Sequence, residues 1–218
     1  MHGTTFARPP LRRIRCALPP CPRSGLRIAA RGSVLVGVRI RAERAAPDLV
    51  ESLLECHERI RRFIDLAGRL ATADAPQAQR AEAARSVARY FAVALPLHAE
   101  DEDLSIAPRL LRPSAPEGAA AAARRMTEEH GPIEALLEAL RPRWEELGAD
   151  PSSIAWQSSA LADGAARLRV LVEPHLAMEE AVVFPAVPRV LSAAEMQSVL
   201  QEMRARRDPG KQLRAIRG

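Results

Sequence analysis

The sequence predicts an all-α protein: an up-down-up-down four-helix bundle with a short extra C-terminal helix and a disordered N-terminal extension. Three observations support this fold class. Apolar residues make up 47% of the 218 residues and aromatic residues only 3%, so the core must consist mainly of Leu, Ala, Val and Ile. Apolar side chains recur at helical spacing in long segments after residue 46. No alternating apolar run is bounded by Asn-Gly or Asp-Gly turns, the pattern typical of β-hairpins.

Residues 1–45 are expected to form the basic extension. They hold ten arginines and a single acid, Glu43, for a net charge of +9, whereas the rest holds 22 basic and 26 acidic residues, a net −4. The basic character therefore belongs to this segment, and we do not expect the bundle to bind nucleic acid. Three interpretations of the segment remain open: a disordered extension, for which a start codon assigned too early is one origin; a targeting peptide; or a basic arm that contacts acidic partners.

The first helix is predicted from Asp48 to Ala71, because its apolar residues recur every three or four positions and include His57 on the same stripe. The second begins at Asp74-Ala-Pro76-Gln77, where Asp74 is expected to cap it. This helix continues through Tyr90 and Phe91 and ends in the proline-rich stretch 108–116.

The third helix is predicted to begin at Ser114-Ala-Pro116-Glu117, which reads as a capping box. Asp150-Pro151 is expected to start the fourth helix, and Ser192-Ala-Ala-Glu195 a short fifth helix followed by a basic tail. The expected organisation is thus a 46–190 bundle and a 191–218 segment containing the short helix and tail.

Three prolines, Pro96, Pro132 and Pro174, fall inside predicted helices, each within two residues of a histidine. An interior proline costs about 3 kcal/mol and bends a helix. We therefore expect helices that are locally reshaped around a site, with misplaced helix boundaries as the alternative.

The most informative motif is an eleven-residue phrase that occurs twice. It runs from His98 to Pro108 and from His175 to Pro185, and each copy has His, Glu four residues on, a second acid at five and Pro at ten. The other two histidines of the predicted bundle precede these phrases by similar intervals, His57 by 41 residues and His130 by 45. The chain therefore presents the pattern His…His-xxx-Glu in two matching halves.

This pattern predicts a two-metal site. Residues four apart on a helix share one face, with Cβ atoms about 5–6 Å apart, so each His-xxx-Glu pair can reach one metal region. If the helices bundle, all four imidazoles point inward, and burying them with two carboxylates would be costly without metal partners. Two histidines per ion and two bridging carboxylates leave open positions, and this ligand set suits iron, with manganese, zinc or cobalt as alternatives. The candidate ligands are His57, His98, Glu102, His130, His175 and Glu179.

Other residues near these ligands have simpler interpretations. A single histidine on an apolar stripe is more often a core residue than a ligand, and Tyr90 and Met126 are expected in the core. The arginine pairs Arg61-Arg62 and Arg124-Arg125 are expected to be solvated. The neighbouring acids are expected on solvated faces, with a few accepting hydrogen bonds from the imidazoles; they are Glu58, Glu100, Asp101, Asp103, Glu128, Glu129 and Glu180.

From Pro47 to Val190 this pattern resembles the hemerythrin-like family, in the branch called the HHE cation-binding domain. The resemblance implies two non-haem irons with an oxo or hydroxo bridge. His57 and His98 would bind one iron, His130 and His175 the other, and Glu102 and Glu179 would bridge the two.

Two departures separate the chain from the oxygen-carrying hemerythrins that it resembles. Those proteins have a further histidine where this chain has Met126, and an Asp five residues after the last histidine where this chain has Glu180. The pattern is closer to the iron-centre repair proteins that respond to nitric oxide. However, Cys16 and Cys21 do not reproduce the paired-cysteine motif of their extra N-terminal domain.

The expected function is that of a di-iron protein that binds O2, NO or peroxide at an open iron position, for sensing, scavenging or iron handling, with an unknown redox partner. The alternatives are a peroxidase-like or oxidase-like di-iron enzyme, a metal-free helical interaction module and a basic-armed regulator. No run of about 18 apolar residues occurs, so no membrane span is expected. Three scattered cysteines favour a cytoplasmic location.

Overall fold

The computed structural model describes residues 48–72 and 74–208. The predicted extension at 1–45 and the end of the basic tail lie outside these residues. The described part of the chain is helical and contains no β-strand, which confirms the predicted all-α class. Within the same residues, no helix is both long enough and apolar enough to cross a membrane.

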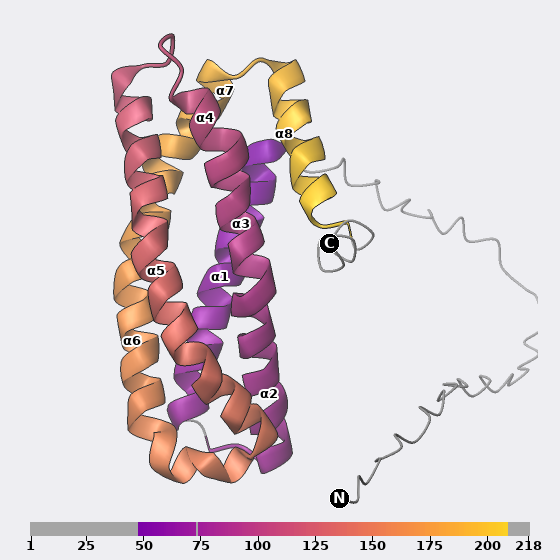
Figure 1. The fold of residues 1–218 in the computed structure, drawn as a ribbon, viewed down its shortest axis with the longest axis vertical. Helices are drawn as coiled ribbons and strands as arrows, with labels where there is room; N and C mark the ends of the chain where they lie inside the picture. Colours follow the sequence, from indigo (N-terminus) through magenta and orange to yellow (C-terminus); the bar gives the residue numbers. More distant parts are fainter. Residues whose placement is uncertain (1–47, 73, 209–218) are drawn as a thin grey trace, which may run out of the picture. The chain divides into compact units, whose positions relative to one another are not determined.

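Four antiparallel arms form the bundle, and consecutive arms run in opposite directions (Figure 1). The first arm is helix α1 (Leu49–Thr72), and the third is helix α5 (Glu117–Ala149). The second arm contains α2 (Gln77–Arg89), η1 (Tyr90–Ala94), α3 (Leu95–Asp101), η2 (Glu102–Ile106) and α4 (Ala107–Leu110). The short 3-10 helix η3 (Pro151–Ser153) precedes the fourth arm, which contains α6 (Ile154–Met178), η4 (Glu179–Val183) and α7 (Phe184–Val190).

The predicted fifth helix is α8 (Ala193–Arg206), which folds back beside the second arm (Figure 1). It begins with the expected capping box, in which the Ser192 hydroxyl accepts from the Glu195 N–H and the Glu195 carboxylate accepts from the Ser192 N–H. The capping box predicted at Ser114 is wrong. Helix α5 begins after Pro116, whose carbonyl accepts from the N–H groups of Ala119 and Ala120, and no side chain caps it.

Three π-helical turns, η1, η2 and η4, interrupt the second and fourth arms, and each is followed at the same interval by a proline: Pro96, Pro108 and Pro185. A proline ring clashes with the carbonyl four residues earlier, which here belongs to the middle residue of the π turn. The wider π turn accommodates this clash. The predicted reshaping is therefore present at Pro96, whereas Pro132 and Pro174 lie within continuous α-helix.

The apolar core consists of two clusters along the bundle. One contains Leu53, Met126 and Phe184, and the other contains Ile60 and Trp144. Tyr90 belongs to the second cluster, where its ring stacks on Phe63 with centroids 3.9 Å apart, so its predicted core role is confirmed. Along each of the first and third arms, a buried histidine separates the residues of one cluster from those of the other. A polar layer therefore interrupts the core.

Candidate metal centre

Six buried polar side chains form this layer, and they are the six ligands that the sequence predicts. Helices α1, α3, α5 and α6 each supply one histidine, and the π turns η2 and η4 each begin with one glutamate. None exposes more than 7% of its surface, and both glutamates are completely buried. The structure thus brings together His57, His98, Glu102, His130, His175 and Glu179.

The six side chains form two groups that share both glutamates. His57 and His98 belong to one group, and His130 and His175 to the other. In each group, one ligand atom from every residue lies within 4.8 Å of the others. The two histidines from the first half of the sequence pattern therefore lie in one group, and the two from the second half lie in the other.

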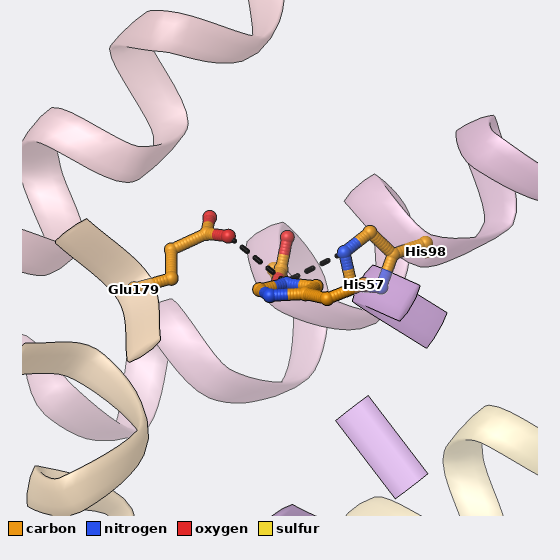
Figure 2. A group of neighbouring side chains, drawn as sticks. His57, His98 and Glu179 are labelled. Atoms are coloured by element: carbon orange, nitrogen blue, oxygen red, sulfur yellow. Dashed lines mark ion pairs between the residues drawn. The ribbon is translucent and has the colours of Figure 1, made fainter. Parts of the chain in front are cut away.

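Glu179 directs one carboxylate oxygen toward each group. Its Oε2 lies 3.2 Å from Nε2 of His57, and its Oε1 lies 2.9 Å from Nε2 of His175. In Figure 2 the side chains of Glu179, His57 and His98 converge from separate elements of the fold, and a dashed line joins Glu179 to His57. The Glu179 carboxylate thus lies where it can bridge two ions.

Glu102 has the matching arrangement. Its Oε1 lies 3.5 Å from Nε2 of His98, and its Oε2 lies 3.3 Å from Nε2 of His130. All four imidazoles therefore present Nε2 to a central carboxylate.

Three of the imidazoles use the opposite ring nitrogen to contact an outer carboxylate. Nδ1 of His57 lies 2.8 Å from Glu180, and Nδ1 of His175 lies 3.0 Å from Glu129. Nδ1 of His130 likewise lies 3.0 Å from Asp103. A ring that donates its Nδ1–H to a carboxylate keeps the Nε2 lone pair free for a metal.

These contacts confirm that a few of the neighbouring acids accept from the imidazoles, and they correct part of the expectation of solvated faces. Glu180 and Glu129 do not lie on purely solvated faces, because each also accepts from a guanidinium, that of Arg61 or Arg125 respectively. Those two arginines were expected to be simply solvated. Asp101 was also expected on a solvated face, yet it is completely buried and pairs with Arg206 at the end of α8 and with Arg207 just after it.

Sequence reasoning did not identify which acids support the ligands, although the doubled phrase contained part of the signal. Asp103 and Glu180 are the acids that stand five residues after the histidine in each phrase. Each contacts an imidazole of the opposite group: Asp103 contacts His130, and Glu180 contacts His57. Glu129, which directly precedes His130, lies outside the phrase.

Burial and mutual charge set the protonation of the metal-free cluster. Burial, reinforced by the charge of Glu179, raises the pKa of Glu102 to about 7. Burial acts in the same sense on Glu179, but its close contacts with the imidazoles of His175 and His57 outweigh it and lower its pKa to about 2. Burial and the neighbouring His57 lower the pKa of His98 to about 3. Burial would also lower the pKa of His130, but its hydrogen bond to Asp103 and its contact with the Glu102 carboxylate raise it to about 10.

The unpaired polar atoms of this layer fit a metal pair. Within the described residues, neither carboxylate oxygen of Glu102 or Glu179 makes a hydrogen bond of acceptable geometry, and neither does Nε2 of His57 or either ring nitrogen of His98. A buried polar group without a partner costs about 1–3 kcal/mol. Four imidazole nitrogens and two shared carboxylates form a donor set suited to two borderline divalent ions. Coordination would give these inward-facing atoms partners.

An apolar pocket of about 30 Å³ lies beside the cluster. His98, His130 and His175 form part of its wall, and apolar residues that include Ile133 and Val172 form most of the rest. About 10–15 Å³ suffices for one water molecule, so the pocket can hold a molecule of two or three atoms. A second pocket, of about 290 Å³, shares the lining residues Pro96, Glu134 and Leu137.

A four-helix bundle whose buried layer holds two His/Glu groups with shared carboxylates defines a class: helical bundles with a candidate two-metal site. The family model described as Hemerythrin HHE cation binding domain matches residues 48–187, and a second match covers residues 124–211. The chain therefore belongs to the hemerythrin HHE cation-binding domain family, as the doubled phrase predicted. A search among curated proteins finds none that matches the chain.

Proposed function

We propose that this protein is a non-haem di-iron protein that binds O2, NO or peroxide at an open iron position, and acts in sensing, scavenging or iron handling. The single observation that carries the proposal is the pair of shared carboxylates. Glu102 and Glu179 each direct one oxygen toward each of two histidine pairs. His57 and His98 would hold one iron, and His130 and His175 the other. Bound iron would supply electrons and a position for a small ligand.

The apolar pocket supports the small-ligand part of the proposal. It is large enough for a diatomic molecule or peroxide, and three of the four candidate imidazoles reach its wall. Its apolar lining would exclude most bulk water from the cluster and admit small neutral molecules.

Met126 favours sensing, scavenging or iron handling over reversible oxygen carriage. It lies one turn before His130 and is completely buried in an apolar cluster, so it cannot supply a third imidazole to that group. Each ion would then have four protein ligands, which leaves positions open at both.

Anaerobic iron loading followed by metal analysis tests the proposal. We expect two irons per chain, one for each His/Glu group, and an optical spectrum that changes on exposure to O2 or NO. His98→Ala combined with His175→Ala should lose the iron. Glu128→Gln is the matched control, because Glu128 is exposed and two residues from His130. A wild-type protein that stays iron-free, or a double variant that binds iron like wild type, would refute the proposal.

A second variant separates metal binding from ligand access. Val172 is buried on the wall of the small pocket, and Val172→Phe would fill it. We expect this variant to keep its iron and lose most of the spectral response to NO. An unchanged response would show that the pocket is not the ligand site.

A further inference from the structure

The outer hydrogen bonds divide the four imidazoles unequally between the two groups. In the His130/His175 group both rings have a carboxylate at Nδ1, namely Asp103 and Glu129. In the His57/His98 group only His57 has one, Glu180. Nδ1 of His98 is buried and makes no hydrogen bond within the described part of the chain.

The doubled sequence explains this inequality. Asp103 and Glu180 occupy equivalent positions in the two phrases, and each supports the ring of the opposite group. Glu129 directly precedes His130, and the residue in the equivalent position before His57 is Cys56. The carboxylate that would match Glu129 and face His98 is therefore replaced by a thiol side chain.

The charge of the surrounding side chains also differs between the two groups, and this difference again favours metal binding by the His130/His175 group. The carboxylates of Glu180 and Glu129 each pair with an arginine, Arg61 and Arg125. Asp103 pairs with His130 and has no arginine partner among the residues that the structure describes. The surroundings of the His130/His175 group therefore hold one more uncompensated negative charge, which favours a dication there.

We infer that the two metal positions are unequal: the His130/His175 position binds its ion first and more tightly, and the His57/His98 position fills second. This inference rests on the proposed two-metal function. An outer carboxylate fixes the imidazole tautomer and makes the ring a stronger donor, and its loss typically lowers metal affinity about 10–100-fold. The absence of such a partner for His98 sets the expected size of the difference. Glu129 is thus a positioning residue that acts through His175, and the equivalent residue Cys56 makes no hydrogen bond to His98.

Anaerobic competition titration against a chromophoric chelator tests the order, with Fe²⁺ and with Zn²⁺. A fixed, mildly alkaline pH reduces competition from protons for the imidazole nitrogens. We expect two binding steps whose dissociation constants differ at least about tenfold. His175→Ala should remove the tight step, and His98→Ala the weak one.

Two further variants test the cause of the difference. Glu129→Gln should weaken the tight step and bring the two constants closer, whereas Glu128→Gln should change neither. Cys56→Glu should strengthen the weak step by placing a carboxylate beside His98, and an unchanged weak step would contradict the assigned cause. Far-UV circular dichroism of each metal-free variant checks that it folds.

The outcomes separate this inference from the proposed function. A wild-type protein that binds no metal refutes the proposed function itself. Two ions bound with indistinguishable constants, or a tight step that survives His175→Ala and disappears in His98→Ala, leave the two-metal function standing and overturn the inference.

Discussion

Helix α8 is held to the second arm by a buried charge cluster, and removal of its cations should destabilise the protein strongly. Asp101 is completely buried, and its two oxygens accept from Arg206 at 2.7 Å and Arg207 at 2.6 Å. Arg206 also donates to the Ser105 hydroxyl at 2.5 Å. Because Asp101 directly precedes Glu102, this cluster fixes the start of the π turn that carries a candidate bridging carboxylate.

The expected magnitude follows from these contacts. A hydrogen bond to a charged group contributes about 1.5–3 kcal/mol, and removing one side of a buried ion pair costs about 3–5 kcal/mol. The Arg207 side chain is 36% exposed, so solvent screens part of its contribution. We therefore expect Arg206→Gln with Arg207→Gln to lower the free energy of unfolding by about 3 kcal/mol. Adding Asp101→Asn should restore roughly half, because no unpaired buried charge then remains.

Urea denaturation of the metal-free variants, followed by circular dichroism, measures these values as a double-mutant cycle. Arg112→Gln is the control, because Arg112 also pairs with α8, through Glu195, but the two side chains are 44% and 32% exposed. Its loss of stability should be much smaller than that of the double arginine variant, because solvent screens this pair. Additive effects, or a double arginine variant as stable as the control, would refute the role assigned to the buried cluster.

Three further predictions concern the polar layer and the core. Burial and Glu179 raise the pKa of Glu102 from 4.5 to about 7, so the metal-free protein should lose up to about 3 kcal/mol of stability as the pH rises through this range. Glu102→Gln should flatten that part of the stability curve measured by urea denaturation, and an equal slope in both proteins would contradict the pKa. A Cβ at Gly164 would lie 2.3 Å from a methyl carbon of Leu140, so Gly164→Ala should lower the Tm, although alanine favours helix by about 1 kcal/mol. Leu140→Val in the same chain should recover part of the loss, and a raised Tm in the single variant would disprove the close contact. Met126→His would place an imidazole in an apolar cluster, so we expect the metal-free variant to have a lower Tm than wild type. Iron loading should raise the Tm of the variant by more than it raises that of wild type. A gain no larger than that of wild type would show that the new ring does not reach the metal.

The sequence predicts the inner residues of the site well because helical spacing alone determines them. His57 and His130 replace apolar residues on stripes that must face the core, so bundling brings them into one layer. The four-residue spacing then places each glutamate beside its histidine. These relations depend only on local periodicity and on the formation of a bundle.

The outer residues depend on details that local periodicity does not contain. In the run of four acids from Glu100 to Asp103, the spacing from His98 singles out Glu102 but does not show what the other three contact. The structure buries Asp101 against Arg206 of α8 and turns Asp103, two residues on and so on nearly the opposite side of the helix, toward His130. The only sequence signal for the π turn beginning at Glu102 is the proline ten residues after His98.

Helix starts show the same difference between local and tertiary information. The side chain of Ser192 caps α8 as predicted, whereas the similar phrase at Ser114 gives no cap. At the start of α5, Pro116 itself takes the N-cap position, with φ −59° and ψ 138°. A proline fixed at the boundary therefore moves the helix start past the serine.

The division of the ligands between two halves has an evolutionary consequence. One helical hairpin with an imidazole on its first arm and His-xxx-Glu on its second needs only a copy of itself to complete a six-ligand centre. Such a centre can arise when two identical hairpins associate about a twofold axis, and later fusion into one chain frees each half to change independently. In this protein the inner ligands match between the two halves, whereas Cys56 beside His57 and Glu129 beside His130 mark where the halves differ.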